Sequence, residues 1–329
     1  MKMTKKKMLF LALCSVLLLL AACNNGGEKN SSNGSGELEG DESYKFGFIL
    51  KTINSEYWKV LMAGANDAAK ELGVEVSFLG PQEETQFEQQ IKMVEDNVAN
   101  GIDAIVIAAS QPDAMITALS NAHKKDIPVV IADTDVDFED KVTFIGTKNF
   151  DAGKLGGEYL SELLNDGDKV AIIRGPFGSE THEERTKGFQ EALEGKNIEF
   201  IIQDAESDRV KAVNVMENIL TSNPDVKAVF ATADEMALGA HTTLKNKNAK
   251  HVLLVGFDGT PDGLQAVLKG DMAANVSQNP YQIGYESVYA AYKAKKGEEV
   301  EKRIDSGTAV ITKENVEEEI GRLNNYINK

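Results

Sequence analysis

The stretch LLVGFDGTPDG at Leu253–Gly263 is an apolar run that ends abruptly in an acid and a glycine-rich turn. Its first half has the composition of a buried strand, whereas Gly259 and Pro261 are typical of a turn. Asp258 stands at the junction, where the strand would leave the core. What this acid does depends on what surrounds the end of the strand, and comparable stretches elsewhere in the chain bear on that question.

The chain alternates short β-rich apolar runs with longer amphipathic segments from Tyr44 onward. This order predicts an α/β fold in which a parallel sheet is covered by helices on both faces. The predicted strands are 45–50, 74–79, 104–109, 128–132, 142–145, 169–174, 198–202, 228–231 and 251–256. The predicted helices are 57–72, 86–100, 113–125, 153–164, 186–193, 211–222 and 236–245.

Polar residues follow the predicted strands in both halves of the chain. GIDAIVIAAS at 101–110 has the form of PDVKAVFATAD at 224–234, which predicts two similar domains with a boundary near 145–149. In an open parallel sheet, the ligand crevice lies outside the carboxyl ends of the strands. If two sheets face each other by these ends, one shared cleft is lined by Lys51-Thr52, Ser110-Gln111, Asp133-Thr134-Asp135, Arg174, Asp234-Glu235 and Asp258.

An acid after a strand can instead cap the next helix, by accepting its free backbone N–H groups. For Asp234, both roles stay open. After Asp258 the turn contains Asp262, which is the better cap candidate and leaves Asp258 free. Asp133 has no helix directly after it. We therefore expect Asp133 and Asp258 to be cleft residues.

The N-terminus has a basic leader, MKMTKKK, followed by an apolar segment at Met8–Leu20 that is too short for an ordinary membrane span. This predicts a secretory signal peptide over 1–22. The sequence Leu-Ala-Ala-Cys at 20–23 resembles the lipobox of bacterial lipoproteins, in which the cysteine is acylated. We expect a lipid on Cys23; an ordinary signal peptide with an incidental cysteine is the alternative. Cys14 would be removed with the leader and no cysteine follows Cys23, so we expect no internal disulfide in the mature chain.

Residues 23–43 are polar and rich in Gly and Ser, which predicts a flexible tether. The formal charge of −17 argues against a nucleic-acid partner, because phosphate recognition needs clustered Lys and Arg. We therefore expect an extracytoplasmic monomer, anchored by lipid to the cell membrane at the cell surface or in the periplasm.

The only tryptophan, Trp58, lies beside Tyr57 at a predicted helix entry. Adjacent helical residues point in different directions, so at least one ring can stand in the cleft. An aromatic face would stack on the C–H face of a sugar ring, while Lys51, Arg185 and the acids would bind its hydroxyls. Two core aromatics are the alternative.

Ordered segments of the chain resemble the bacterial sugar-binding proteins of the ribose- and allose-binding family, which serve ABC importers. They are FILKTINSEYW at 48–58, EERTKGFQEAL at 183–193, SDRVKAVNVMENIL at 207–220, AVFATADEMALGA at 228–240, VGFDGTPDG at 255–263 and VSQNPYQIG at 276–284. The resemblance covers 44–315 and implies two doubly wound parallel-sheet lobes of the type 1 periplasmic binding protein fold. The implied lobes are 44–147 plus 279–305 and 148–278 plus 306–329, with crossings near 146–149, 278–280 and 304–307.

The resemblance also implies a binding site for a sugar. Tyr57 and Trp58 would sandwich the ring from one lobe, and a lysine at Lys51 matches the allose-binding branch, where the ribose-binding branch has serine. The expected ligand-binding set is Lys51, Ser55, Tyr57, Trp58, Asp133, Arg185, Asp258 and Gln278.

Several positions depart from the ribose-binding pattern. Thr134 replaces an arginine, Ala233 and Ala108 replace asparagines, and Ser207 replaces an aromatic residue. These losses argue against ribose and favour a larger or differently substituted monosaccharide, a cyclitol or a related polyol-like signal molecule. Further side chains that could reach such a ligand are Asp135, Glu180, His182 and Asp234.

The sequence contains no motif for a metal, a cofactor or nucleophilic catalysis, and its four histidines are isolated. A paired-carboxylate hydrolase could use Asp133 and Asp258, but the sequence offers nothing that would raise the pKa of one acid alone. We predict a ligand-binding protein that closes about a hinge and delivers its ligand to an ABC permease. The alternatives are a receptor for sensing or chemotaxis, and an enzyme such as an NAD-dependent dehydrogenase or a glycosidase. A DNA-binding repressor is disfavoured, because the leader and tether stand where its DNA-binding helices would be.

Overall fold

The computed structural model describes residues 43–327, and residues from Ser43 onward form one compact unit. The predicted signal peptide, Cys23 and all of the predicted tether except Ser43 lie outside the described residues. Among the residues that are described, no helix has both the length and the apolar character needed to cross a bilayer.

The first sheet has six strands in the order β11-β5-β4-β3-β1-β2, all parallel to their neighbours. The strands are β1 (Lys45–Ile49), β2 (Glu75–Leu79), β3 (Ala104–Ile107), β4 (Val129–Asp133), β5 (Thr143–Gly146) and β11 (Arg303–Asp305). The central strands β3, β4 and β5 are buried throughout, as their uninterrupted apolar runs predict for strands covered on both faces.

The second sheet repeats this arrangement in the order β12-β10-β9-β8-β6-β7. Its strands are β6 (Lys169–Arg174), β7 (Glu199–Asp204), β8 (Ala228–Ala231), β9 (Leu253–Asp258), β10 (Ala274–Ser277) and β12 (Ala309–Ile311). The strands are parallel except for β12, which pairs antiparallel with β10 at the edge. The α/β prediction with two mostly parallel sheets is confirmed.

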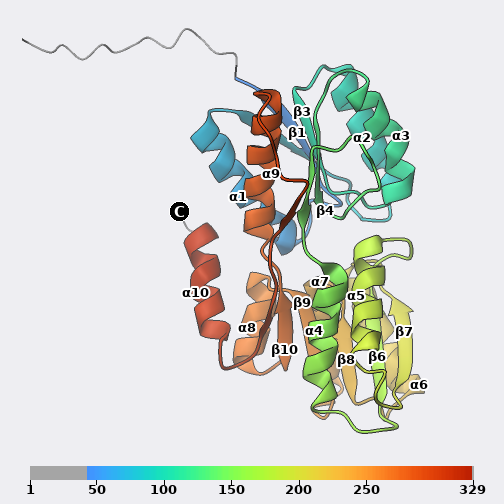
Figure 1. Cartoon of the computed structure of the whole chain (residues 1–329). Coiled ribbons are helices and arrows are strands. Elements are labelled where there is room, and N and C mark those ends of the chain that lie inside the picture. The colour runs from blue at the N-terminus through green and yellow to red at the C-terminus, as the bar shows by residue number, and fades with distance from the viewer. Residues whose placement is uncertain (1–42, 328–329) are drawn as a thin grey trace, which may run out of the picture. The chain divides into compact units, whose positions relative to one another are not determined.

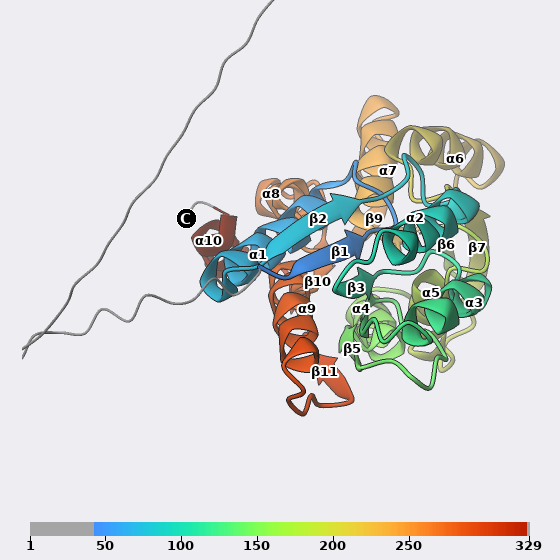
Figure 2. The same ribbon diagram turned by 90° about the horizontal axis from the view of Figure 1, so that it is seen from above.

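Helices cover both faces of each sheet. They are α1 (Glu56–Leu72), α2 (Phe87–Ala99), α3 (Pro112–His123), α4 (Asn149–Ser161), α5 (Glu180–Glu191), α6 (Arg209–Ser222), α7 (Asp234–Asn246), α8 (Pro261–Lys269), α9 (Pro280–Lys295) and α10 (Val316–Ile327). In the first sheet, α1 and α9 pack on one face and α2 and α3 on the other (Figure 2). In the second, α4 and α5 cover one face and α6, α7, α8 and α10 the other.

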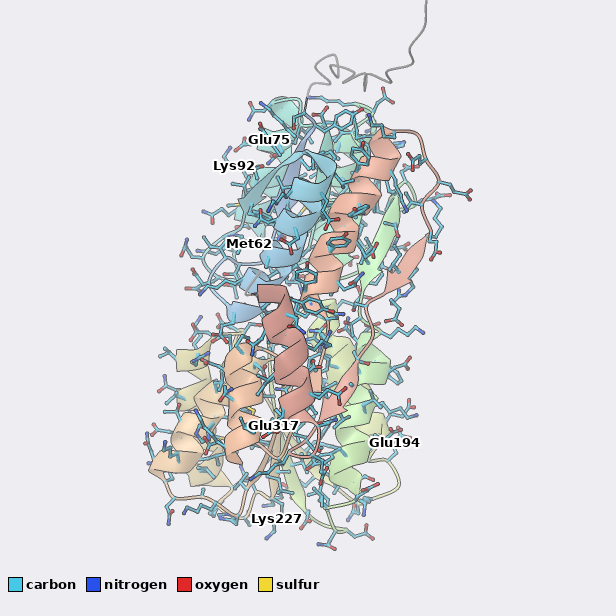
Figure 3. All side chains as sticks on the ribbon, turned by 90° about the vertical axis from the view of Figure 1, so that its left-hand side faces the viewer. Met62, Glu75, Lys92, Glu194, Lys227 and Glu317 are labelled. Atoms are coloured by element: carbon cyan, nitrogen blue, oxygen red, sulfur yellow. The ribbon has the colours of Figure 1, made fainter. Side chains whose placement is uncertain are left out.

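Three segments connect the two sheets (Figure 1). Residues 147–148 lead from β5 to α4, residues 278–279 from β10 to α9, and residues 306–308 from β11 to β12. Helix α9 thus returns to the first sheet and packs along α1. Helix α10 packs on α8, and one of its ends meets the ends of α1 and α9 (Figure 3). We propose that the two sheets and their helices are the two lobes expected from the sequence, with the bounds given there.

The nine predicted strands are present with ends shifted by up to two residues, but β10, β11, β12, α8 and α10 were not predicted. The largest shift is in α5, which begins at Glu180 and not near Thr186. Its first turn has acidic residues, Glu180 and Glu183, which favour a helix N-terminus. This earlier start places Thr181 and His182 on the helix.

Candidate binding site

A cavity lies between the carboxyl ends of the two sheets, and all eight expected residues line it. Counted out to its solvent opening, the space free of protein atoms is about 440 Å³. The cavity is also lined by Thr52, Glu84, Thr181, His182, Ser207, Ala233 and Glu235. The eight residues expected to bind a ligand therefore lie together in one cavity. That they contact a ligand stays a prediction.

Asp133 and Asp258 end strands β4 and β9 with unusual backbone angles. Their φ values are 63° and 113°, in a region that residues other than glycine rarely adopt. Each such residue costs on the order of 1–3 kcal/mol and persists only where the surroundings enforce it. The strain turns both strands at the point where their carboxylates face the cavity, which supports a functional role for the two acids.

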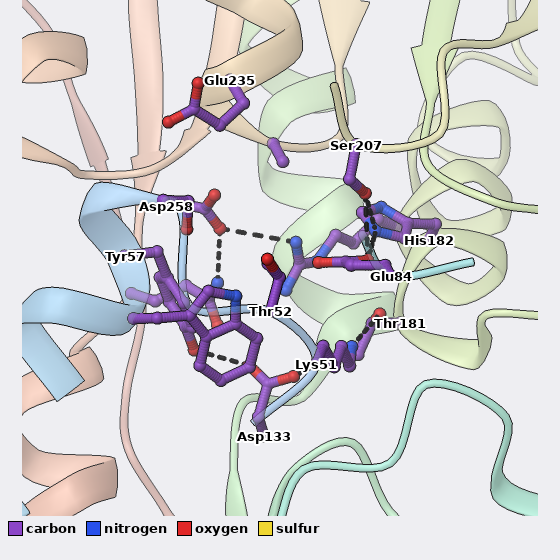
Figure 4. Close-up of a pocket in the computed structure, with 15 residues that line it drawn as sticks. Lys51, Thr52, Tyr57, Glu84, Asp133, Thr181, His182, Ser207, Glu235 and Asp258 are labelled. Atoms are coloured by element: carbon purple, nitrogen blue, oxygen red, sulfur yellow. Dashed lines mark hydrogen bonds and ion pairs between the residues drawn. The ribbon is translucent and has the colours of Figure 1, made fainter. Parts of the chain in front are cut away.

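In the first lobe, Asp133 is held by a cation and a phenol (Figure 4). Lys51 Nζ lies 3.0 Å from Asp133 Oδ2, and the Tyr57 hydroxyl donates to Oδ1 at 2.6 Å. Burial acts to raise the pKa of Asp133, but the charges of Lys51 and Arg185 and the bond from Tyr57 outweigh it, so the pKa lies below its usual value. Burial, with nearby Asp133, raises the pKa of Tyr57 well above normal. Asp133 is therefore ionised and Tyr57 protonated at neutral pH.

Tyr57 and Trp58 form an edge-to-face pair with ring centroids 5.0 Å apart. Both belong to the apolar cluster between α1, α9 and the first sheet, and both also line the cavity. The two roles weighed for these aromatic residues, core packing and cavity lining, are therefore combined.

In the second lobe, Arg185 on α5 holds the wall opposite Asp133. Its Nε donates to Asn149 Oδ1 at 2.9 Å, and one terminal nitrogen donates to the Thr232 carbonyl at 2.8 Å. The same nitrogen lies 3.5 Å from Asp258 Oδ1, and the guanidinium is 3.9 Å from the centre of the Phe257 ring. With four fixed partners, the side chain is preorganised before any ligand binds.

Asp258 is part of a buried pair of acids. It accepts a bond from Gln278 Nε2 at 2.7 Å and one from the backbone N–H of Asp234 at 3.3 Å. Asp234 itself accepts from both the N–H and the hydroxyl of Thr260. Burial is the largest cause that raises the pKa of Asp258, to about 8, and that of Asp234, to about 7.

Asp234, for which both roles stayed open, neither caps its own helix nor lines the cavity, but binds Thr260 of the neighbouring segment. Two expectations about these acids were wrong. The first concerns Asp262, since α8 is capped by the Thr260 hydroxyl. The expectation that nothing would raise the pKa of one acid alone also fails, since burial raises the pKa of Asp258 while ion pairing lowers that of Asp133. Burial of this kind depends on which strand ends meet, and that is decided by the tertiary structure.

Glu84 is a cavity residue that was not predicted. It lies between β2 and α2, its side chain is 11% exposed, and its Oε2 accepts from Ser207 Oγ of the other lobe at 3.0 Å. His182 Nε2 is 3.7 Å from the same oxygen, and burial lowers the pKa of His182 to about 4, so the ring is neutral at neutral pH. Burial acts to raise the pKa of Glu84, but the nearby His182 and the charge of Lys51 outweigh it, so the pKa lies below its usual value. An ionised carboxylate therefore reaches into the cavity at this end (Figure 4).

The other polar residues named from the sequence differ in whether they line this cavity. Arg174 pairs with Glu183 at 2.7 Å and does not line the cavity. Asp135 and Glu180 line a separate hollow. His182, whose position stayed open, does line the cavity and is 3% exposed.

Several hydrogen bonds and ion pairs bridge the two sheets around the cavity. Lys51 Nζ donates to Thr181 Oγ1 at 3.1 Å, beside the bond between Glu84 and Ser207. At the rim, Gln111 Nε2 donates to the Phe177 carbonyl at 3.3 Å, Lys211 lies 3.4 Å from Glu83, and the N–H of Asp262 donates to Glu56 at 3.1 Å. The carboxyl ends of the two sheets are thus held against each other.

The buried acid pair should make stability depend on pH. In the unfolded chain an aspartate has a pKa of about 3.9, whereas folding raises the pKa of Asp258 to about 8. The contribution of such a group is fully present below about pH 4 and is lost as pH rises towards its folded pKa. We expect the free energy of unfolding to fall between pH 6.5 and 8.5, and to fall less in Asp258→Asn.

Urea unfolding of the ligand-free protein across this range measures how the free energy of unfolding changes with pH. The range also avoids most of the titration of His182. Folding lowers the pKa of His182, so its contribution to stability is lost as pH falls below about 6.5, which is the opposite direction. Asp262→Asn, at a side chain that is 53% exposed, is the control and should keep the wild-type slope. Equal slopes in wild type and Asp258→Asn would contradict the expectation.

Within residues 43–327, no group of three His, Cys, Asp or Glu side chains is placed to hold a metal ion. The ionic residues of the cavity are instead satisfied by one another and by neighbouring polar groups, as the contacts of Asp133, Arg185 and Asp258 show.

Comparison with known proteins identifies relatives along most of the chain. The ribose import binding protein of Escherichia coli strain K12 is 35% identical over 267 residues, which cover 81% of this chain and 90% of that protein. A solute-binding protein of Actinobacillus succinogenes with bound D-allose has a TM-score of 0.78 at 28% identity, covering 84% of this chain and 100% of that chain. One from Bacillus halodurans with bound myo-inositol has a TM-score of 0.78 at 28% identity, covering 86% of this chain and 99% of that chain.

These relatives are solute-binding proteins and not enzymes, which agrees with the prediction that this chain is not an enzyme. Their folds match the two-sheet arrangement of type 1 periplasmic binding proteins. The model of the periplasmic binding protein domain matches residues 46–299. The chain therefore belongs to the periplasmic binding protein family.

Proposed function

We propose that this protein binds one hydroxyl-rich ring, a monosaccharide or a cyclitol, in the cavity between its two lobes. The observation that carries this proposal is the combination, in one cavity, of an aromatic pair with the ion pair of Lys51 and Asp133 and with the polar contact between Arg185 and Asp258. A sugar or cyclitol ring has apolar C–H faces and a rim of hydroxyls that both donate and accept. The Trp58 ring can stack on the C–H face, and the fixed charged groups can form hydrogen bonds with the hydroxyls.

Lys51, Ser55, Tyr57, Trp58, Asp133, Arg185, Asp258 and Gln278 are the proposed ligand contacts. Glu84 and His182 add polar groups at the end of the cavity where Ser207 lies. Polar groups at this end favour a ligand with an additional hydroxyl that reaches them, and hence a hexose or a cyclitol over a pentose. D-allose and myo-inositol, which the related solved proteins hold, are rings of this kind.

Binding would proceed by closure of the lobes about the three connecting segments. A ligand that contacts both lobes binds the closed arrangement more tightly than an open one. This difference in affinity sets how far the ligand shifts the protein towards the closed arrangement. The bridging contacts from Lys51 to Thr181 and from Glu84 to Ser207 would form only on closure. The closed form would then be recognised by an ABC permease in the membrane.

A lipid on Cys23 would hold the protein at the outer face of the membrane, next to its permease, and raise its effective concentration there. The relatives' periplasmic and import-binding descriptions support an extracytoplasmic location. Expression of the full chain in a bacterial host with labelled palmitate tests the anchor. We expect Cys23→Ser to lose the label and to move from the membrane fraction to the soluble fraction. Label retained in this variant would refute the anchor.

Titration of D-allose, myo-inositol and D-ribose into residues 43–329 tests the binding function, with Trp58 fluorescence and calorimetry as readouts. We expect saturable binding of D-allose or myo-inositol, with ribose weaker. Absence of binding to all three at millimolar concentration, or chemical turnover of a bound sugar, would refute the proposal.

A further inference from the structure

Each of the three segments that connect the lobes begins with a buried polar residue. Thr147 directly follows β5, Gln278 directly follows β10, and Ser306 directly follows β11. They are 2%, 3% and 9% exposed. Although they lie far apart in the sequence, their side chains meet at one place between the lobes.

The three side chains form a hydrogen-bonded chain that ends in the cavity. Thr147 Oγ1 donates to Gln278 Oε1 at 2.6 Å and lies 3.1 Å from Ser306 Oγ, and Gln278 Nε2 donates to Asp258 Oδ1 at 2.7 Å. A hydroxyl has one hydrogen to donate. Because Thr147 gives its hydrogen to Gln278, Ser306 must be the donor to Thr147. The chain therefore has one direction, from Ser306 through Thr147 and Gln278 to Asp258.

This direction fixes which end of the Gln278 amide faces the cavity. With the Thr147 hydroxyl on its carbonyl oxygen, the amide presents its NH2 group to Asp258 and to the cavity. A flipped amide would place its oxygen against Asp258 Oδ1, which could donate to it only when Asp258 is protonated. The observed orientation, with the Thr147 hydroxyl on the Gln278 carbonyl oxygen, lets Gln278 donate to Asp258 in both protonation states of the acid.

We propose that Thr147 and Ser306 are positioning residues for ligand binding, which orient Gln278 and Asp258 through this chain and complete it only in the closed arrangement of the lobes. The inference rests on the proposed binding of a monosaccharide or cyclitol. The three partners stand on three separate connecting segments, so rotation of one lobe against the other changes the distances between them. Closure therefore sets the donor pattern of the cavity at the same time as it encloses the ligand.

The test compares Thr147→Val and Thr147→Ser with a matched control. Thr143 begins β5, the strand that Thr147 follows, and is 0% exposed. Its hydroxyl bonds only weakly to a neighbouring carbonyl, at 3.4 Å from the oxygen of Phe144. Thr143→Val therefore removes a buried hydroxyl and leaves the hydrogen bonds between Ser306, Thr147, Gln278 and Asp258 in place. The probes are D-allose, myo-inositol and D-ribose, titrated by calorimetry, and thermal unfolding is measured for every variant.

We expect Thr147→Val to lose about tenfold in affinity, the size expected when a buried hydrogen-bond partner is removed. Thr147→Ser keeps the hydroxyl and should bind within about twofold of wild type, as should Thr143→Val. Ser306→Ala should lose less, about threefold, because Thr147 then still donates to Gln278. Thermal unfolding of the same variants, together with Thr143→Val, separates a loss of affinity from a general loss of stability.

Three results would overturn the inference: Thr147→Val binding like wild type, Thr143→Val losing as much as Thr147→Val, or Thr147→Ser failing to restore affinity. If Thr147→Val does not fold, Ser306→Ala decides, and unchanged affinity in that variant also overturns the inference. Failure of the wild type to bind all three probes is a separate outcome, since it refutes the binding function itself.

Discussion

Replacing Arg185 with alanine should weaken binding of D-allose or myo-inositol by about 100-fold or more. The side chain is 4% exposed and connects Asn149, the Thr232 carbonyl and Asp258. Its loss removes a donor to the ligand and leaves the Asn149 amide oxygen and the Thr232 carbonyl without their donor in a buried place. Leaving a buried acceptor unsatisfied costs about 1–3 kcal/mol, and part of this cost would appear as lost affinity for a ligand that binds beside it.

Arg174→Ala is the matched control for this prediction. Arg174 is as buried, at 3% exposed, ends the neighbouring strand β6, and pairs with Glu183 at 2.7 Å, but it does not line the cavity. We expect both variants to lower the unfolding midpoint, and only Arg185→Ala to lose affinity by calorimetry. Equal affinities in the two variants would show that Arg185 acts through stability alone.

The part of the site that could be predicted from sequence is the part at the strand ends. Asp133 and Asp258 are the last residues of β4 and β9, and Lys51 lies two residues after β1. Parallel topology brings such positions to one edge, so no knowledge of side-chain contacts was needed. The same rule also named Arg174, which lies at the right edge but pairs with Glu183 away from the cavity. The rule gives the edge and not the direction of a side chain.

Glu84 could not be found in this way, because it lies five residues beyond the end of β2, on an irregular segment. Its place in the cavity depends on the path of that segment and on Ser207 in the other lobe. The resemblance to sugar-binding proteins marked Ser207 only as the loss of an aromatic residue. In the structure, Ser207 donates a hydrogen bond to Glu84. A serine at this position therefore removes a stacking surface and at the same time supplies a partner for the Glu84 carboxylate.

The chain through Thr147 and Ser306 escaped prediction for a related reason. Both residues directly follow short strands, and β11, which precedes Ser306, has only three residues and was not predicted at all. Short edge strands have weak patterns, because a few residues cannot show an alternation of polar and apolar side chains. The resemblance thus implied where the connecting segments lie, but not that the side chains of Thr147 and Ser306 meet between the lobes.

Replacing Trp58 with alanine should remove most of the ligand affinity and also lower stability. Trp58 is 3% exposed, packs in the core of the first lobe and lines the cavity. Removing a buried tryptophan costs about 3–5 kcal/mol of unfolding free energy. Loss of the stacking face should cost about 1–3 kcal/mol of binding, by analogy with the stacking of bases on aromatic side chains. Trp58→Phe keeps a ring, so it should retain the fold and show an intermediate affinity.

Phe46→Ala separates the two effects of Trp58. Phe46 is 0% exposed and belongs to the same apolar cluster, but it does not line the cavity. We expect it to lose stability on the scale of Trp58→Ala, about 3–5 kcal/mol, and to bind D-allose or myo-inositol as wild type does below its unfolding midpoint. Calorimetry is the readout, because Trp58 is the only tryptophan and its replacement removes the fluorescence signal. Wild-type affinity in folded Trp58→Ala would exclude stacking on this ring, and the ligand would then be held by the polar groups of the cavity alone.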